Sequence, residues 1–306
     1  MTRSLKFSRR NFCLSGGQAL AITGLAGPAL AQRRQARAPI AQTIVSALSE
    51  LADAELISGR PEAAVTGVAL LSNPTLAALR KAVAAHCSLI LSPETPFYAH
   101  PADPAAASAP FAAMAASAIS ALHESPAFKA KQAFIADHGL TVYRLNPRAN
   151  SGRDISAEAT AARFGWTAHR VPGEHPIYAP PGMSVGTLIG LAHARLGASG
   201  GLRFIGDPAM RLRSILIVPG TAEVVSTTQA LRHADALLTG DVREWEVVTY
   251  INDSAEAGLP KALVATGRIL SEQPLVERCA LAVRNAFPGV PLRNLVEPDP
   301  FWRVQA

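Results

Sequence analysis

The sequence predicts an α/β fold of two similar lobes, in which mixed, largely parallel sheets are flanked by helices. Short aliphatic runs alternate with segments of helical periodicity along most of the chain. A strand, a helix and a strand at 68–91 are repeated at 215–238 with the same spacing and without a gap. Four prolines within 172–181 separate the two halves, because proline resists both helices and central strands. We therefore expect a first lobe over 32–175 and a second lobe over 176–306.

In the first half, the helix at 74–86 has the clearest start, because Asn73 offers an N-cap and Pro74 suits the first helical position. This helix lies between two aliphatic runs, and such a unit implies a right-handed crossover between parallel strands. The segment 101–122 is rich in alanine and serine, which predicts a loop and a weakly specified helix. The other expected elements are helices at 40–56, 128–137 and 155–164 and strands at 65–71, 89–91 and 140–145.

The second half predicts the same kinds of element. Its strand at 215–218 stops at Pro219 and Gly220, and a helix at 221–232 leads into the next strand. A loop through Pro274 is expected before the last helix, because proline inside a helix removes a backbone hydrogen bond. The other expected elements are strands at 236–238, 262–265 and 292–296 and helices at 244–257 and from 275 to 286.

The N-terminal segment 1–31 predicts a twin-arginine export signal. Arg9 and Arg10 precede an apolar stretch rich in glycine and alanine, which ends in the small-x-small cleavage pattern Ala29-Leu-Ala31. A transmembrane anchor is the alternative, but glycine and alanine dilute the apolar run that a membrane span requires. We therefore expect a periplasmic or secreted protein that has no membrane contact after cleavage.

Removal of residues 1–31 changes the charge of the protein. These residues carry four positive charges and no acid, so the formal net charge of +6 becomes about +2. A near-neutral chain lacks the basic surface that nucleic-acid binding needs, so no nucleic-acid partner is expected.

Two cysteines remain after cleavage, Cys87 and Cys279, and both lie in apolar helical contexts. An oxidising compartment permits a disulfide between them, but such contexts favour free, buried thiols. No Cys-x-x-Cys pair is present in the sequence, which excludes a thiolate zinc site.

Three loops that follow predicted strands carry the polar side chains of interest. Because the ends of parallel strands lie at one edge of a sheet, the loops at 92–96, 146–150 and 266–272 are expected to converge on one cleft. The side chains that these loops offer are Glu94, Asn146, Asn150, Arg268, Ser271 and Glu272. The sequence thus predicts a ligand site with carboxylate, amide and guanidinium groups.

Four stretches of the chain carry a family resemblance. They are Pro74-Thr-Leu to Phe97-Tyr98, Lys131-Gln-Ala-Phe-Ile-Ala-Asp-His-Gly-Leu-Thr-Val-Tyr-Arg144, Asp235-Ala-Leu-Leu-Thr-Gly-Asp-Val-Arg-Glu-Trp-Glu246 and the closing Asp299-Pro-Phe-Trp302. Their residue types and spacing resemble those of the Nif-three-like dinuclear-metal-centre family, whose members include GTP cyclohydrolase I type 2 homologues. The resemblance covers nearly all of the chain after residue 31. It implies two similar α/β lobes, a ring-shaped homohexamer and two metal ions between the lobes.

The metal-ligand motifs of that family are altered in this chain. Where the family has Ser-His-His-Pro or Ser-His-Glu-Pro, this chain has Ser92-Pro93-Glu94, with proline in place of the first histidine. Asn146 replaces a histidine after the next strand, and Asn150 replaces an aspartate four residues later. In the third motif, Arg268 replaces histidine and Glu272 is retained. The resemblance thus implies Glu94 and Glu272 as surviving metal ligands, Asn146 and Asn150 as weak ones, and Pro93 and Arg268 as substituted positions.

Ligand chemistry argues against a tightly held metal. Divalent transition metals prefer imidazole, thiolate or carboxylate, and an asparagine amide is a weak substitute. Arg268 brings a fixed positive charge to the place that a cation would occupy. We hypothesise that its guanidinium stands in for the metal by bridging Glu94 and Glu272. The cofactor is then absent, or it is a weakly bound divalent metal such as zinc, iron or manganese.

Two functions follow from these alternatives. The first is a non-catalytic ring protein that binds a small molecule. The second is a metal-dependent hydrolase of a small, nucleotide-like substrate that uses an altered metal site. The sequence leaves enzymatic activity open, and the expected partners are other copies of the chain and a small-molecule ligand.

Overall fold

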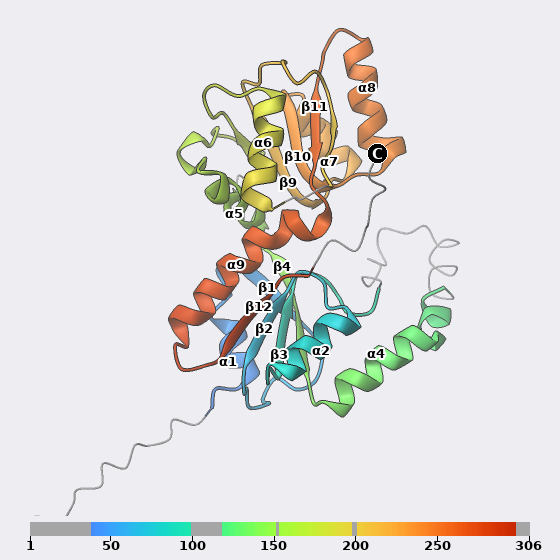
Figure 1. Ribbon diagram of the computed structural model, residues 1–306, viewed down its shortest axis with the longest axis vertical. Coiled ribbons are helices and arrows are strands. Elements are labelled where there is room, and N and C mark those ends of the chain that lie inside the picture. Colours follow the sequence, from blue (N-terminus) through green and yellow to red (C-terminus); the bar gives the residue numbers. More distant parts are fainter. Residues whose placement is uncertain (1–37, 99–117, 151–152, 198–200, 298–306) are drawn as a thin grey trace, which may run out of the picture. The chain divides into compact units, whose positions relative to one another are not determined.

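The computed structural model describes residues 38–98, 118–150, 153–197 and 201–297 (Figure 1). They belong to one compact unit, Ala38–Ala306. The expected export signal at 1–31, most of the alanine- and serine-rich segment 101–122 and the motif Asp299–Trp302 lie outside the described residues. At the end of that alanine-rich segment, residues 118–124 are helical.

Two mixed sheets of five strands each form the framework. The first sheet has the order β1 (Ala52–Ser58), β4 (Thr141–Pro147), β3 (Leu89–Ser92), β2 (Val68–Leu71) and β12 (Leu292–Leu295). In it, β1 is antiparallel to β4 and the other neighbours are parallel. The second sheet has the order β7 (Ile177–Tyr178), β9 (Ile215–Thr221), β10 (Ala236–Asp241), β11 (Ala262–Ala265) and β8 (Arg203–Ile205). Its central three strands are parallel and both edge strands are antiparallel, so the predicted fold class is confirmed.

The predicted internal repeat is present in both sheets. In the first sheet, α2 (Leu76–Ala84) connects the parallel strands β2 and β3, and in the second sheet α7 (Val224–Leu231) connects β9 and β10 in the same way. Every residue of β2 and β3 is buried, as expected for strands covered on both faces. The N-cap of α2 is Thr75 rather than Asn73, because the Thr75 hydroxyl accepts a hydrogen bond of 3.1 Å from the Ala78 amide.

Three other helices begin at similar polar caps. The side chains of Ser125, Asp154 and Ser184 each accept a hydrogen bond from the amide three residues further on. The helices of the described residues, besides α2 and α7, are α1 (Ala41–Ser46), α4 (Pro126–Asp137), α5 (Ile155–Phe164), α6 (Val185–Leu196), α8 (Thr249–Glu256) and α9 (Arg268–Ala286). A two-stranded pair, β5 (Ala149–Asn150) with β6 (Arg153–Asp154), precedes α5.

Sheet membership crosses the expected lobe boundary at 175/176. The last strand, β12, pairs with β2 of the first sheet, and α9 buries Leu275, Val276 and Cys279 in the core beside that sheet. Conversely, α5 buries Ala161 and Phe164 in the core beside the second sheet. Local composition placed the boundary in the sequence, whereas strand pairing joins segments more than two hundred residues apart.

The helix expected over 40–56 is wrong in its second half. Ile44, Val45 and Leu48 are buried as the helical spacing predicts, but α1 ends at Ser46 and β1 begins at Ala52. The backbone of β1 pairs with β4, from Ala52 opposite Pro147 to Leu56 opposite Tyr143. The free edge of β4 supplies hydrogen-bond partners that the local helical pattern cannot anticipate.

The loop expected through Pro274 is also wrong. Helix α9 begins at Arg268 and continues through Pro274 to Ala286. Burial of Leu275, Val276 and Cys279 against the first sheet offsets the backbone hydrogen bond that Pro274 cannot donate. The helix expected at 244–257 is present but begins with a π-helical turn at Glu244–Val248.

The core holds both cysteines as free thiols. Cys87 and Cys279 are buried in different hydrophobic clusters, which are those of α2 and of α9. None of the helices in the described part of the chain is long and apolar enough to cross a membrane.

Candidate functional site

A cavity of about 490 Å³ lies where strands of both sheets end. Its wall comes from the loops after β2, β3 and β11, from the end of β10, from the start of β8 with the residues before it, and from the first turn of α9. The lining residues are Ser72, Asn73, Glu94, Gly201, Arg203, Gly240, Asp241, Thr266, Gly267, Arg268, Ile269, Leu270 and Glu272. Loops at the carboxyl ends of parallel strands are where α/β proteins bind ligands. Two of the three loops singled out in the sequence therefore meet at this cavity.

Arg268 lies between two carboxylates in the wall of the cavity. Its Nη2 forms a hydrogen-bonded ion pair with Glu94 Oε1, and its Nε is 3.5 Å from Glu272 Oε1. Its Nη1 donates a hydrogen bond of 2.8 Å to Thr221 Oγ1 at the end of β9. The side chains of Glu94 and Glu272 are 15% and 9% exposed, whereas that of Arg268 is 41% exposed. The guanidinium thus lies near both carboxylates, but of the two it is hydrogen-bonded to Glu94 alone, since Arg268 Nε has no hydrogen-bond partner among the described residues.

The loop that carries Glu94 is held by polar contacts on both sides. Ser92 Oγ accepts a hydrogen bond of 3.1 Å from the Glu94 amide and donates one of 3.2 Å to the Ser72 carbonyl. Lys131, which is only 5% exposed, donates a hydrogen bond of 2.6 Å to the Pro96 carbonyl. Burial lowers the pKa of this lysine, so its charge is held against a desolvation cost. These contacts fix the position of the Glu94 carboxylate relative to β3.

The start of α9 is held as tightly as the Glu94 loop. Ser271 Oγ accepts a hydrogen bond of 2.9 Å from the Gly220 amide and donates one of 2.7 Å to the Arg268 carbonyl. A Cβ atom on Gly240 would lie 2.3 Å from Ser271 Oγ and 2.5 Å from the Gly220 carbonyl oxygen, so only glycine fits there. Arg268 and Glu272 are one helical turn apart, which places both on the same face of α9.

Electrostatics in the cavity favour a protonated Glu272. Burial in the first place, and the neighbouring Glu94 in the second, raise the pKa of this carboxyl to about 8 against the opposing charges of Arg268 and Arg144. At neutral pH the group therefore holds its proton. Glu272 Oε2 is buried and has no hydrogen-bond partner among the described residues, so this oxygen is available to a ligand or a water molecule.

Comparison with known proteins gives matches in structure and none in sequence. No family model matches the sequence, and no curated protein matches it. A Bacillus cereus protein related to NIF3 superposes with a TM-score of 0.65 at 11% identity, over 88% of this chain and 100% of that chain. The Staphylococcus aureus hypothetical protein SA1388 gives 0.64 at 13% identity, over 87% and 100% of the two chains. A NIF3 superfamily protein from Sphaerobacter thermophilus gives 0.52 at 13% identity, over 85% and 99%.

This chain has the NIF3 fold. The resemblance expected from the sequence is thus confirmed at the level of the fold, and both sheets take part in the match because it covers most of the chain.

The residues of this NIF3-like cavity do not fit a dinuclear metal centre. Glu94 and Glu272 are its only carboxylates in contact with Arg268, and Arg268 carries a positive charge between them. Among residues 38–98, 118–150, 153–197 and 201–297, no three His, Cys, Asp or Glu side chains are grouped to hold a metal ion. A metal ion would have to displace a guanidinium and deprotonate Glu272 while it gained at most two protein carboxylates.

Asn146 and Asn150, the weak ligand candidates, are not among the residues that line the cavity. Asn146 lies inside β4, opposite Asp53 of β1, because β4 continues two residues past the strand end that the sequence predicts. Asn150 lies in β5, and its side chain is outside the described part of the structure. Pro93 contributes only a carbonyl oxygen, which accepts a hydrogen bond of 3.3 Å from Arg144 Nε.

Three charged residues near the cavity were missed in the sequence. Arg144 lies level with Ser92 on the neighbouring strand and lowers the pKa of Glu272 through its charge. Arg203 and Asp241 both line the cavity and form an ion pair of 3.6 Å. Asp241 comes shortly after the predicted strand at 236–238 and directly after Gly240, where only glycine fits. The rule that side chains after parallel strands line ligand sites could therefore have identified Asp241 in the sequence as well.

Proposed function

We propose that this chain is an exported NIF3-like protein whose metal site has become a metal-free binding site for a small molecule. The observation that carries the proposal is the contact of Arg268 with both Glu94 and Glu272. In this position the guanidinium neutralises Glu94 and lies beside the protonated Glu272, in the place of a cation.

The remaining groups of the cavity support binding rather than catalysis by a metal. Its volume of about 490 Å³ is in the range of small-molecule sites. The first turn of α9 faces it, and the N-cap Gly267 offers no side chain to the first amides of that helix. A ligand with hydrogen-bond acceptors can use these amides, while Glu272 Oε2 offers one further polar contact.

The proposal has two further parts, which are export of the chain and assembly of several copies. Arg9 and Arg10 with the following apolar stretch support transport through the twin-arginine route to the periplasm or the medium. The NIF3 fold supports assembly of several copies, for which the family resemblance proposes a hexamer. Size-exclusion chromatography with light scattering and fractionation of the producing cell test these two parts.

The metal-free site is tested by elemental analysis of the purified mature protein. We expect far less than one divalent metal per chain. Near-stoichiometric metal that is lost in Glu94→Ala would overturn the proposal and support the alternative, a metal-dependent hydrolase with an altered site.

A pair of variants at one position sharpens this test. Arg268→His adds an imidazole beside two carboxylates, and we expect it to gain zinc affinity. Arg268→Gln removes the same charge without adding an imidazole, and we expect no such gain. Equal zinc affinity of the two variants contradicts the idea that Arg268 occupies the place of a metal ion.

A further inference from the structure

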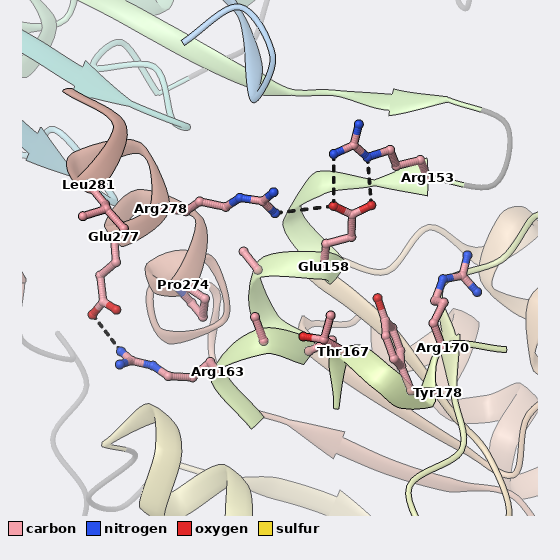
Figure 2. Close-up of a pocket in the computed structure, with 13 residues that line it drawn as sticks. Arg153, Glu158, Arg163, Thr167, Arg170, Tyr178, Pro274, Glu277, Arg278 and Leu281 are labelled. Atoms are coloured by element: carbon pink, nitrogen blue, oxygen red, sulfur yellow. Dashed lines mark hydrogen bonds and ion pairs between the residues drawn. The ribbon is translucent and has the colours of Figure 1, made fainter. Parts of the chain in front are cut away.

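A second groove, of about 800 Å³, lies between α5 and α9, and none of its lining residues lines the first cavity. Figure 2 shows four arginines around it: Arg153 from β6, Arg163 from α5, Arg170 from the segment before β7, and Arg278 from α9. They come from four separate segments of the chain. Three of them lie within residues 153–170, and the packing of α9 brings Arg278 beside them from more than a hundred residues further along the chain.

The carboxylates of the groove do not balance these arginines. Glu158 accepts hydrogen bonds from Arg153 Nε at 2.9 Å and from Arg278 Nη1 at 3.4 Å, so two guanidiniums share one carboxylate (Figure 2). Glu277 accepts one bond of 2.7 Å from Arg163 Nη2. The lining therefore carries four arginines against two glutamates, a formal excess of two positive charges.

One arginine of the groove keeps a donor for a further partner. Arg163 Nε is buried and has no hydrogen-bond partner among the described residues. Arg170 is held by its own segment, because it donates to the carbonyls of Val171, of Gly173 at 3.3 Å and of Ile177 at 3.4 Å. Asp154, the N-cap of α5, is not part of the lining, but the Arg170 charge acts on it and opposes the rise in its pKa that burial causes. If these ion pairs only joined α5 to α9, one arginine for each carboxylate would suffice. The lining has four arginines for two glutamates.

The floor of the groove is apolar. Ala159 and Ala162 of α5 and Pro274 and Leu281 of α9 line it, and the Leu281 side chain is 53% exposed. At one end, the guanidinium carbon of Arg170 lies 5.6 Å from the centre of the Tyr178 ring. The groove thus combines an apolar surface with a cationic rim.

We propose that this groove binds a small phosphate-bearing molecule whose apolar or aromatic part lies on the alanine floor. Arginine is suited to this task because its planar donors match two phosphate oxygens at once. A phosphate monoester carries close to two negative charges at neutral pH, which complement the positive charge of the lining. The volume is in the range of ligand sites, and the site does not depend on whether the first cavity holds a metal.

The test is calorimetric titration of the purified full chain with phenyl phosphate at low ionic strength, where charges are weakly screened. Inorganic phosphate and phenol serve as the two halves of the probe. We expect phenyl phosphate to bind more tightly than inorganic phosphate, and phenol to give no measurable binding. Absence of binding by phenyl phosphate in the unmodified protein would overturn the proposal.

Variants assign the binding to the groove. Arg163→Gln and Arg278→Gln should each weaken phenyl phosphate binding about tenfold, which is the usual effect of losing one charge-assisted hydrogen bond. Arg60→Gln is the matched control, because Arg60 is an exposed arginine paired with Glu62 at 3.8 Å and outside the groove. An equal loss of affinity in Arg60→Gln would overturn the assignment.

A further variant separates binding from a structural role. Glu277→Gln frees Arg163 and adds one net positive charge to the groove, so phenyl phosphate should bind more tightly. If Arg163 and Glu277 serve only to join the helices, this variant weakens the fold and gives no gain in affinity. Thermal unfolding of each variant shows that the titrated protein is folded.

Discussion

The cavity at the strand ends and the groove between α5 and α9 both contain arginines and glutamates, but they differ in how far the positive and negative charges are balanced. In the cavity, Glu272 is 9% exposed, and each charge is matched by a neighbour or removed by protonation. In the groove, Arg163 and Glu277 are 35% and 38% exposed, and positive charge remains in excess. Desolvation makes an unmatched charge costly in the cavity, whereas water screens it in the groove. The same ion-pair chemistry therefore supports the fold in one place and is available to a partner in the other.

The largest effect that separates the two sites is expected from Glu272. Its pKa is about 8 in the folded chain and near the ordinary 4.5 in the unfolded chain, so folding takes up a proton between these values. The free energy of unfolding contributed by this group is full below pH 4.5 and falls as the pH rises through 8, by a total of the order of 5 kcal/mol. Urea unfolding at several pH values measures it. Glu272→Gln should flatten the curve, and identical pH profiles for variant and unmodified protein would contradict the protonated state.

The second-largest effect on stability is expected from Arg268, the arginine between the two glutamates of the cavity. Arg268→Gln leaves Glu94 without its ion-pair partner, and we expect the free energy of unfolding to fall by about 2 kcal/mol, a value reduced because Arg268 is partly exposed. The same change in a Glu94→Gln background should cost less than half as much. Equal costs in the two backgrounds would show that Arg268 and Glu94 do not interact.

A smaller effect is expected at the loop that carries Glu94. Lys131→Met keeps the apolar length of a buried side chain but removes the donor to the Pro96 carbonyl. We expect a loss of about 1.5 kcal/mol in the free energy of unfolding. Faster amide exchange at Glu94 and Phe97 should accompany it, because their amides are bonded to side chains of the same loop. Unchanged exchange there would mean that Lys131 does not hold the loop.

The smallest effect on stability is expected in the groove. Arg163→Gln and Arg278→Gln remove half-exposed ion pairs, so each should change the free energy of unfolding by less than about 0.5 kcal/mol. Chemical unfolding at neutral pH measures this. A loss of unfolding free energy as large as that of Arg268→Gln would contradict the expected difference between the cavity and the groove.

The candidate cavity was largely predictable because its parts follow one rule. Glu94 and Arg268 each come directly after a buried parallel strand, and parallel strands end at one edge of a sheet. Asn146 breaks the expectation, since β4 continues as far as Pro147 by pairing with β1. That pairing involves a segment expected to be helical, so the error in the first helix and the error at Asn146 have one cause.

The groove could not be predicted from the sequence. Its arginines lie on four segments, and Arg278 belongs to a helix whose beginning was expected to be a loop up to Pro274. Nothing in the local spacing of Arg153 and Arg278 indicates that both reach Glu158. Such convergence depends on the packing of α5 against α9, which joins positions more than a hundred residues apart.

The sequence by itself determined the class of the fold, the repeated strand, helix and strand, and the absence of histidine from the loops around Glu94 and Arg268. These are local properties, because periodicity, turn residues and side-chain type are fixed within a few positions. The tertiary structure decided that β12 returns to the first sheet, that Arg268 contacts both carboxylates, that Glu272 holds a proton, and that four arginines surround one groove. These properties depend on which surfaces exclude water from one another, and that is settled only when distant segments pack together.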